Sequence, residues 1–205
     1  MPERLAIPGF LRGSRWTARS PGPRYCVLYE VADPAVLDSA QYRERLDHPT
    51  PWTSDMMKHY VGMSRTLCSV LATSGNGLGA FLCLIRFTPQ PDREAELHRW
   101  LADSAMPSLS QRPGLAACYL LGQAAPAAMT REQQIRGRDA SARSSLFMTG
   151  YDAGIIALLA DELSAAHLCD RGAMADGYAF NLFQQSFSLA STDLSPRRLS
   201  PSSPC

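Results

Sequence analysis

The chain has 205 residues, of which 45% are hydrophobic and 19% charged, enough apolar material for one large domain or two small ones. Its 20 basic and 19 acidic residues give a net charge of +1 without a block of like charge, so the composition excludes an electrostatic basis for binding nucleic acid or an anionic membrane. No apolar run approaches the roughly 20 residues that cross a bilayer. No signal-peptide core follows Met1, so a cytoplasmic protein is expected.

The first half of the chain predicts two strands with two helices between them. Residues 25–31 are rich in aromatic and β-branched side chains and predict a strand. Asp33 followed by proline is a strong helix start, and this helix is expected to continue to about residue 46. A second short helix is expected from near Ser54, and residues 67–72 predict the next strand.

A glycine-rich stretch at residues 74–79 follows. Its glycines lead into a predicted strand at residues 80–87 and not into a helix. Phosphate-binding loops hold their phosphate at the N-terminus of a helix. We therefore interpret the stretch as a turn or linker and reject a nucleotide site.

The second half predicts a strand, a helix, two strands, a helix and a strand. The near-continuous apolar run at residues 80–87 indicates a central strand that is buried on both faces. The later elements are a helix from Pro91, strands at 117–121 and 145–151, a helix from Asp152 and a strand at 178–187. A long loop is expected at 130–143 and a disordered tail at 191–205.

The element order of the second half is that of a ferredoxin-like unit, and the first half shows the later part of the same order. Met1-Pro2 and Pro8-Gly9 recur with the same spacing as Met106-Pro107 and Pro113-Gly114. The sequence therefore predicts an α+β fold of tandem ferredoxin-like repeats. The predicted divisions are a first repeat at 1–74, a linker at 75–79, a second repeat at 80–190 and a tail at 191–205.

In this alignment the first repeat lacks its first strand and most of its first helix. The first strand of such a sheet is central, so its loss would expose strand edges and half of a core. One hypothesis is that the chain is truncated at its N-terminus or that its start was assigned too late. The alternative is that a partner chain supplies the strand.

Two segments resemble the dimeric α+β-barrel superfamily, nearest to its EthD-like and related uncharacterised members. Residues 7–16 resemble the helix end, Pro-Gly turn and second strand of that family, and residues 25–46 resemble its third strand and second helix. The resemblance implies a sheet that curves around a cavity for a small apolar or aromatic molecule. It is also compatible with a homodimer.

The resemblance further implies a small-molecule enzyme, such as a cofactor-free oxygenase, isomerase or cyclase-like protein. Members of the family commonly carry Trp and then His-x-Pro on the first helix. Trp100 and Pro107 match this pattern, but Ala105 stands at the His position. Ala105 favours the alternative, a non-catalytic ligand-binding or accessory protein with a degenerate site. A haem-binding variant is a third alternative that no residue indicates.

Large aromatic side chains and arginines are the candidates for lining such a cavity. An aromatic ring binds apolar molecules and a Tyr hydroxyl can orient them, with ordinary core packing as the alternative. An inward arginine could pair with a substrate carboxylate, although strand alternation places about half of such residues outside. The candidates are Trp16, Tyr29, Trp52, Tyr119, Arg12 and Arg86.

His59 and Glu30 are the candidate acid–base residues. An imidazole titrates near neutral pH and suits a general base, but a histidine at the boundary of an amphipathic helix is the alternative for His59. Glu30 could serve as an acid or base, or could pair with a neighbouring arginine. His98 is expected to face solvent.

The six cysteines and the other histidines do not suggest a metal site. No two cysteines form a CxxC pair, and most lie in apolar stretches, which favours reduced, buried thiols. No histidine pair has the i, i+4 spacing of a helical metal site. We therefore expect neither a metal nor another cofactor.

Overall fold

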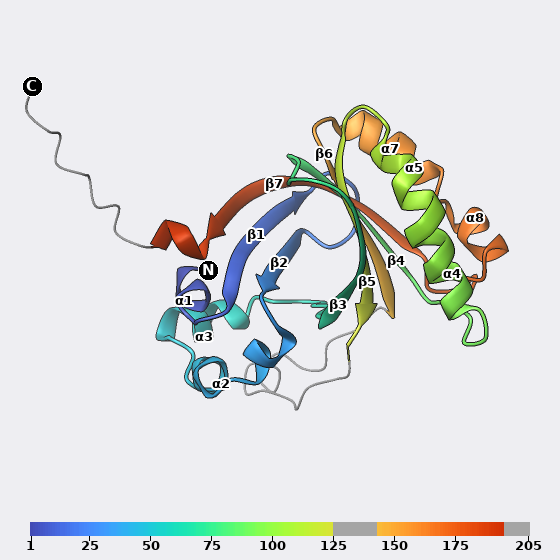
Figure 1. The fold of residues 1–205 in the computed structure, drawn as a ribbon. Helices are drawn as coiled ribbons and strands as arrows, with labels where there is room; N and C mark the ends of the chain where they lie inside the picture. The colour runs from blue at the N-terminus through green and yellow to red at the C-terminus, as the bar shows by residue number, and fades with distance from the viewer. Residues whose placement is uncertain (125–142, 195–205) are drawn as a thin grey trace, which may run out of the picture.

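The computed structural model describes residues 1–124 and 143–194 as an α+β protein with one curled antiparallel sheet (Figure 1). The seven strands lie in the order β2-β1-β7-β4-β6-β5-β3. Their bounds are β1 Phe10–Ala18, β2 Tyr25–Val31, β3 Cys68–Gly75, β4 Phe81–Phe87, β5 Leu115–Gln123, β6 Ser144–Gly150 and β7 Ala179–Ala190.

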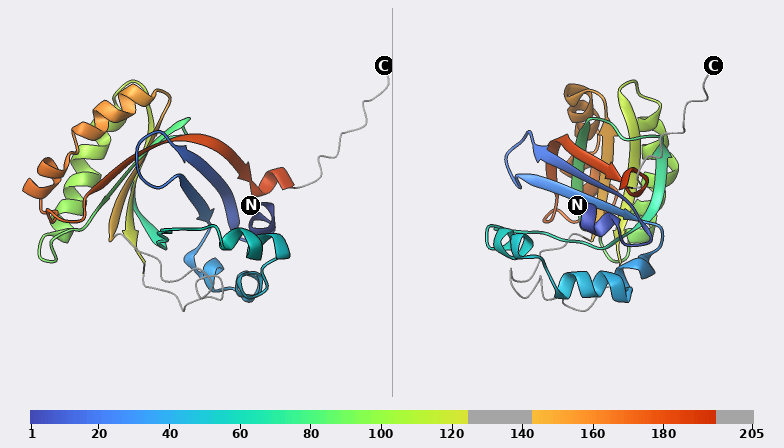
Figure 2. Two further views of the ribbon diagram at one scale, coloured as in Figure 1. Left: turned by 180° about the vertical axis from the view of Figure 1, so that it is seen from behind. Right: turned by 90° about the vertical axis from the view of Figure 1, so that its left-hand side faces the viewer.

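The helices lie in two groups at the two ends of the arch that the sheet forms (Figures 1 and 2). The first group is α1 Pro2–Leu5, η1 Pro34–Asp38, α2 Ala40–Asp47 and α3 Pro51–Met57. The second group is α4 Glu94–Trp100, the π-helical turn η2 Leu101–Ala105, α5 Met106–Ser110, α7 Ala153–Asp161 and α8 Ala165–Asp170. A 3-10 turn, η3 Ser191–Leu194, follows β7. None of the helices in the described ranges is long and apolar enough to cross a membrane.

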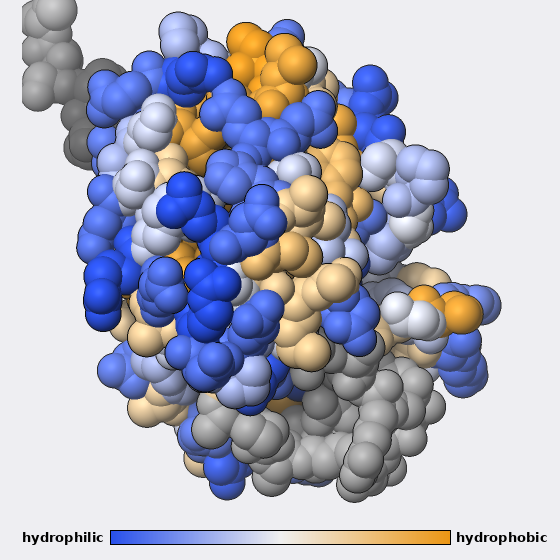
Figure 3. Space-filling view, turned by 90° about the vertical axis from the view of Figure 1, so that its right-hand side faces the viewer, coloured by the Kyte–Doolittle hydropathy of each residue, from blue (hydrophilic) through white to orange (hydrophobic). Residues whose placement is uncertain are grey.

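We call residues 80–190 the C-terminal segment. Its strands lie in the order β7-β4-β6-β5, which is the order of a ferredoxin-like sheet. The central position predicted for the apolar run at 80–87 is confirmed, because β4 pairs with both β6 and β7. The helices α4, α5 and α7 cover the convex face of this part of the sheet. This side of the molecule shows hydrophilic residues with hydrophobic patches between them (Figure 3).

We call residues 1–75 the N-terminal segment. Its strands occupy both ends of the sheet, with β1 and β2 at one end and β3 at the other. A separate core of Leu5, Ile7, Phe10, Tyr42 and Leu46 joins α1 and α2 to the convex face of β1 and β2. The first and last strands of the sheet therefore belong to the same segment of sequence.

The prediction of one helix over residues 34–46 is wrong, because Ser39 interrupts it and separates η1 from α2. The Asp33 carboxylate accepts a hydrogen bond from the Ala35 N–H at 2.7 Å and starts only the short η1. Ser39 then has extended backbone, and its hydroxyl accepts from the Tyr42 N–H to start α2. Two capping residues in succession thus give two short helices.

Most of the remaining elements agree in kind with the predictions but differ at their bounds, whereas α8, which Ser164 caps, was not predicted as a separate helix. The second short helix begins earlier than expected, since Thr50 caps it and proline occupies its first turn. Ser191–Leu194 form η3, so the tail predicted to be disordered from residue 191 begins with a turn. Residues 195–205, and residues 130–142 of the predicted loop, lie outside the described residues.

Candidate functional site

The concave face of the curled sheet carries the candidate site. Because successive side chains of a strand point to opposite faces, one set packs against the helices and the other set lies on this inner face. Trp16, Leu82, Phe147 and Phe183 form the buried centre of the inner set. Other inner residues packed against them include Cys26, Leu28, Leu84, Tyr119 and Leu121. The middle of the concave face is therefore apolar.

Aromatic contacts show that the sheet curls far enough for its walls to meet. Trp16 on β1 and Phe147 on β6 have ring centroids 5.3 Å apart in an edge-to-face arrangement, although β7 and β4 lie between their strands. Phe147 is in turn 6.2 Å from the ring of Tyr119 on the neighbouring β5. These three rings form an aromatic row across the interior.

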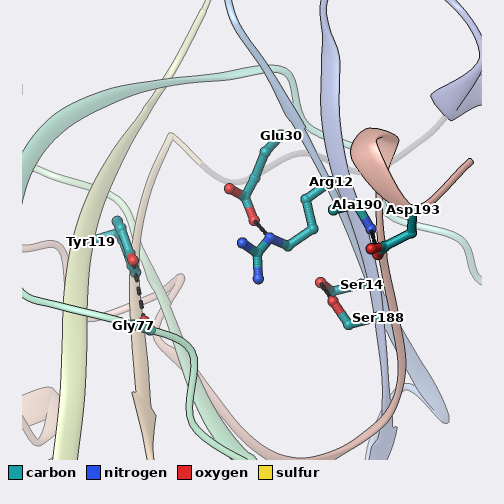
Figure 4. A network of polar contacts seen from close by, with 8 residues as sticks. All are labelled: Arg12, Ser14, Glu30, Gly77, Tyr119, Ser188, Ala190 and Asp193. Carbon is teal, nitrogen blue, oxygen red and sulfur yellow. Dashed lines mark hydrogen bonds and ion pairs between the residues drawn. The ribbon is translucent and has the colours of Figure 1, made fainter. Parts of the chain in front are cut away.

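A polar group faces the interior beside this row. The Arg12 Nε lies 3.7 Å from a Glu30 carboxylate oxygen, and both side chains are partly exposed. Figure 4 shows this pair and Tyr119 on opposite sides of the same space. The Tyr119 hydroxyl donates a hydrogen bond of 3.5 Å to the Gly77 carbonyl oxygen. Ser14 and Ser188 share a hydrogen bond of 3.0 Å between their hydroxyls on the same face.

The titration of these groups follows from their partial burial. Burial raises the pKa of Glu30, and the nearby Arg12 guanidinium opposes that rise. Burial also raises the pKa of Tyr119, and the negative charge of Glu30 adds to the effect. Glu30 therefore holds a proton more tightly than an exposed glutamate does, which suits a carboxyl that exchanges a proton with a ligand.

A second polar cluster surrounds Arg86. Its Nη2 donates to the Asn181 side-chain oxygen at 3.0 Å, and the Asn181 amide donates to the Pro21 carbonyl oxygen at 3.3 Å. Three buried polar atoms find no partner among the described residues: Trp16 Nε1, Arg86 Nε and Thr149 Oγ1. All three residues belong to the inner-facing set, on three different strands. Because buried polar groups are normally hydrogen-bonded, these atoms are available to a polar ligand or to water.

Five predicted site residues therefore share the concave face: Arg12, Trp16, Glu30, Arg86 and Tyr119. Tyr29 lies on the opposite face, because it neighbours Glu30 on β2, and its ring packs 5.9 Å from Phe10. Trp52 is 71% exposed on α3, and His59 is exposed just after that helix. The structure does not bring Tyr29, Trp52 or His59 into the concave face.

Residues that the sequence reasoning missed include Ser14, Phe147, Thr149 and Asn181. Strand alternation could have identified them, because each stands two residues from another inner-facing residue in its strand. His98 was expected to face solvent, and it does so only in part. It is half-buried on the convex side, with Nε2 2.9 Å from the Ser144 hydroxyl, and burial lowers its pKa. It lines an open surface depression of about 500 Å³ with Glu94, Ser69 and Leu71.

Cys26 and Cys118 are protonated at neutral pH, and the described residues do not form a metal-ligand cluster. Burial raises the pKa of Cys26 to about 12, so its thiol stays protonated at neutral pH. The same cause raises the pKa of Cys118, on the convex side, to about 12. No three His, Cys, Asp or Glu side chains gather as a metal site within residues 1–124 and 143–194.

Comparison with known proteins identifies the fold. No family model and no curated protein matches the sequence. An anthrone oxidase-like protein is similar in structure, with a TM-score of 0.63 and 13% identity over 91% of this chain and 81% of that chain. A proposed monooxygenase from Fusobacterium nucleatum subsp. nucleatum gives a TM-score of 0.56 and 9% identity over 89% and 78%.

A third protein of similar structure is not named as an oxidase or a monooxygenase. It is a major regulator of staphylococcal pathogenesis, with a TM-score of 0.51 and 13% identity over 85% of this chain and 84% of that chain. Identities this low show a shared fold alone, and proteins with different roles use this fold. The α+β, ferredoxin-like class is therefore confirmed, whereas the nearer likeness to EthD-like proteins stays a prediction.

Proposed function

We propose that the concave face binds a small aromatic molecule that carries oxygen substituents, and that the protein acts on it as a cofactor-free oxygenase. The observation that carries the proposal is the aromatic row of Trp16, Phe147 and Tyr119 beside buried polar atoms that have no partner among the described residues. An apolar wall with a few convergent polar groups is the usual composition of a small-molecule site. The indole N–H and the guanidinium can donate to oxygen atoms of the ligand.

Glu30 is the residue that we expect to move a proton. Its raised pKa lets the carboxylate accept a proton from an acidic C–H or O–H of the ligand. The Arg12 guanidinium at 3.7 Å lies close enough to stabilise the negative charge that develops. An electron-rich aromatic anion can itself reduce dioxygen: a C–O bond forms to give a hydroperoxide, whose O–O bond then breaks to leave a ring carbonyl and release one water, so this chemistry requires no resident cofactor. The names of two structural neighbours, an anthrone oxidase-like protein and a proposed monooxygenase, favour this reaction class.

Anthrone is a suitable probe for the binding step. We expect it to quench tryptophan fluorescence to saturation in the natural chain. Trp16→Phe should abolish most of this change and weaken binding measured by calorimetry, since Trp16 is fully buried in the aromatic row. Trp52→Phe is the matched control, because its side chain is 71% exposed away from this face. Equal effects of the two substitutions would contradict the proposal.

The oxygenase step is tested by oxygen consumption. Anthrone should drive oxygen uptake that Glu30→Gln reduces by at least tenfold while calorimetric binding persists. Binding without any uptake by the natural chain would favour the second candidate function, a non-catalytic ligand-binding protein. The observation behind that candidate is that none of the four histidines lies on the concave face. His48 and His59 are exposed. His98 hydrogen-bonds the Ser144 hydroxyl, and His167 hydrogen-bonds the Glu162 carbonyl oxygen, both outside the concave face.

A further inference from the structure

The two arginines of the concave face differ in how their charge is balanced. Arg12 lies 3.7 Å from the Glu30 carboxylate, so its charge is balanced within the protein. Arg86, which is partly buried, forms no ion pair with a carboxylate of residues 1–124 or 143–194. Removing a charge from water is costly unless an opposite charge and hydrogen bonds compensate for it. Arg86 is therefore the inner-facing cation that an anion from outside the chain would stabilise.

The neighbours of Arg86 place it at the end of the aromatic row. Arg86 stands on β4 two residues after Leu84, which belongs to the inner-facing set. Its Nε is buried and has no hydrogen-bond partner among the described residues. Its cross-strand neighbour is the buried Ser145, which stands on β6 two residues before Phe147. A charged N–H donor and a hydroxyl therefore lie side by side next to the apolar centre.

Asn181 orients the guanidinium without neutralising it. The Asn181 side-chain oxygen accepts from Arg86 Nη2 at 3.0 Å, and the Asn181 amide donates to the Pro21 carbonyl oxygen at 3.3 Å. A guanidinium only donates and a carbonyl oxygen only accepts, so these two partners fix which way the amide points. Because an amide carries no charge, the positive charge of Arg86 stays unbalanced.

The turn between β1 and β2 holds Asn181 in this position. The N–H of Leu182, the next residue of β7, donates to the Ser20 hydroxyl of the turn at 3.0 Å. Gly22 of the turn has a φ of +130°, and a Cβ there would lie 2.6 Å from the Asn181 amide nitrogen. The turn therefore packs directly against Asn181. Arg86 is held ready for a ligand, which lowers the entropy cost of binding.

Arg86 and Glu30 lie toward opposite ends of the concave face. Burial raises the pKa of Cys26, and the Arg86 guanidinium opposes that rise, so Arg86 lies near Cys26. At Glu30, where burial also raises the pKa, the opposing charge comes from Arg12. Cys26 and Glu30 are four residues apart on β2, which is roughly 13 Å along a strand. An elongated ligand with an apolar middle can therefore contact both groups.

We propose that Arg86 binds a carboxylate at one end of the ligand and thereby makes the concave face selective for aromatic carboxylic acids. This proposal rests on the aromatic-binding function proposed above and names the class of ligand. The guanidinium matches the geometry of a carboxylate, and hydrogen bonds between charged groups are stronger than those between neutral groups. The Arg86 Nε–H and the Ser145 hydroxyl donate to the carboxylate, while the rings lie along the aromatic row toward Glu30.

The charge of the site favours a carboxylate over a phosphate. One arginine balances one negative charge, and a phosphate monoester carries close to two. The second negative charge would find no cation, because Arg12 is already paired with Glu30. The carboxylate is thus the anionic group that this face balances fully.

Two anthracene derivatives that differ in one group test the charge preference. Anthracenecarboxylate is negatively charged, and anthracenecarboxamide, substituted at the same ring position, has nearly the same shape and is neutral. In a fluorescence titration of the natural chain, we expect a Kd about tenfold lower for the carboxylate, the usual effect of a charged hydrogen bond. Equal affinities would overturn this proposal and leave the aromatic-binding function standing. Binding of neither probe would overturn both.

Substitutions on the two faces separate the role of Arg86 from the total charge of the protein. Arg86→Gln should weaken binding of the carboxylate about tenfold and that of the carboxamide less than about twofold. Arg15→Gln is the matched control, because Arg15 is exposed on the opposite face and its Nε bonds the Ser186 hydroxyl. It should leave both affinities unchanged. Equal effects of the two substitutions on carboxylate binding would overturn the proposal.

Asn181→Asp tests the same point without removing Arg86. An aspartate at this position would place a negative charge beside Arg86 Nη2 and balance the guanidinium within the protein. It should abolish the preference for the carboxylate while the carboxamide still binds. Thermal denaturation checks that each variant is folded. A preference for the carboxylate that survives both Arg86→Gln and Asn181→Asp would overturn the proposal, whatever the outcome for oxygen uptake.

Discussion

The N-terminal and C-terminal segments build matching strand pairs in different surroundings. Their bulges and the positive-φ glycines that precede β1 and β5 agree, although the residues at matched positions differ: Glu30 faces Arg12 where Thr149 faces Ala117. Backbone features therefore set the register of both pairs, and side-chain identity at these positions is free to vary. This freedom allows each segment to provide both polar groups and apolar packing on the same concave face, with Glu30 and Trp16 from one segment and Thr149 and Phe147 from the other.

The neighbours of each strand then decide how much it contributes to stability. β6 lies between two strands and under helices, whereas β2 pairs with β1 alone among the described strands. Leu146→Ala should lower the free energy of unfolding by about 2–5 kcal/mol, the usual cost of such a truncation in a core. Val27→Ala should change it by less than about 0.5 kcal/mol in the 205-residue chain. Urea denaturation measures both, and equal losses would contradict the comparison.

Substitution of Gly9 and Gly114 tests whether the turns before β1 and β5 need the same backbone conformation. Gly9→Ala and Gly114→Ala should each cost about 1–3 kcal/mol, because φ is positive and a Cβ would approach Val36 or Ile155 within 3.0 Å. Gly62→Ala is the control, since its φ is +64° and no atom lies within 4 Å of the new Cβ. Thermal denaturation of the three variants gives the ranking. A cost at Gly62 as large as at Gly114 would show that contact with the neighbouring helix is unimportant.

The two capping aspartates should differ because the helices that they start differ. Asp152→Ala should cost about 1 kcal/mol, the usual loss for an N-cap. Asp33→Ala should cost less, since Asp33 caps only the five-residue η1 with no buried residue, whereas α7 buries Ile156 and Leu159. Asparagine at either position should restore most of the loss. The comparison would be wrong if the loss at Asp33 were the larger one.

The smallest effect concerns the charge on Glu30. Its pKa in the folded chain should lie above the ordinary value of 4.5, because burial outweighs the attraction of Arg12. A carboxyl with a raised pKa favours the folded state at pH values below its unfolded pKa. That contribution is lost as the pH rises through the folded pKa. Carboxyl NMR titration measures the midpoint, and Arg12→Met should raise it further. A midpoint below 4.5 would contradict the assignment.

Local sequence patterns predicted the elements but not every boundary. The apolar run at 80–87 and the aspartate before α7 were sufficient for β4 and α7, because periodicity and capping act over a few residues. Ser39 was missed as a second cap, so two helices were merged into one. The loop and most of the tail predicted at 130–143 and 191–205 lie outside the described residues and stay predictions.

The candidate site was predicted less completely than the fold. Alternation along β2 means that Tyr29 and Glu30 cannot share a face, but the sequence did not state which of them points inward. Trp52 was proposed from its residue type, and the structure leaves it 71% exposed. Thr149 and Asn181 were missed, because strand alternation places them on the same face as Phe147 and Phe183 but does not by itself show which face lines the interior.

The sequence by itself determined the kind and order of most elements and the ferredoxin-like order of the second half, since propensity, periodicity and caps are local. Tertiary structure decided which strand face lines the interior, that the rings of Trp16 and Phe147 meet across the curled sheet, and that β2 and β3 are its two terminal strands. Those features depend on pairings between strands that are separated in the sequence, such as β1 with β7, in which Arg12 pairs with Ala190. Their formation is governed by the packing of the whole sheet and not by any single stretch of sequence.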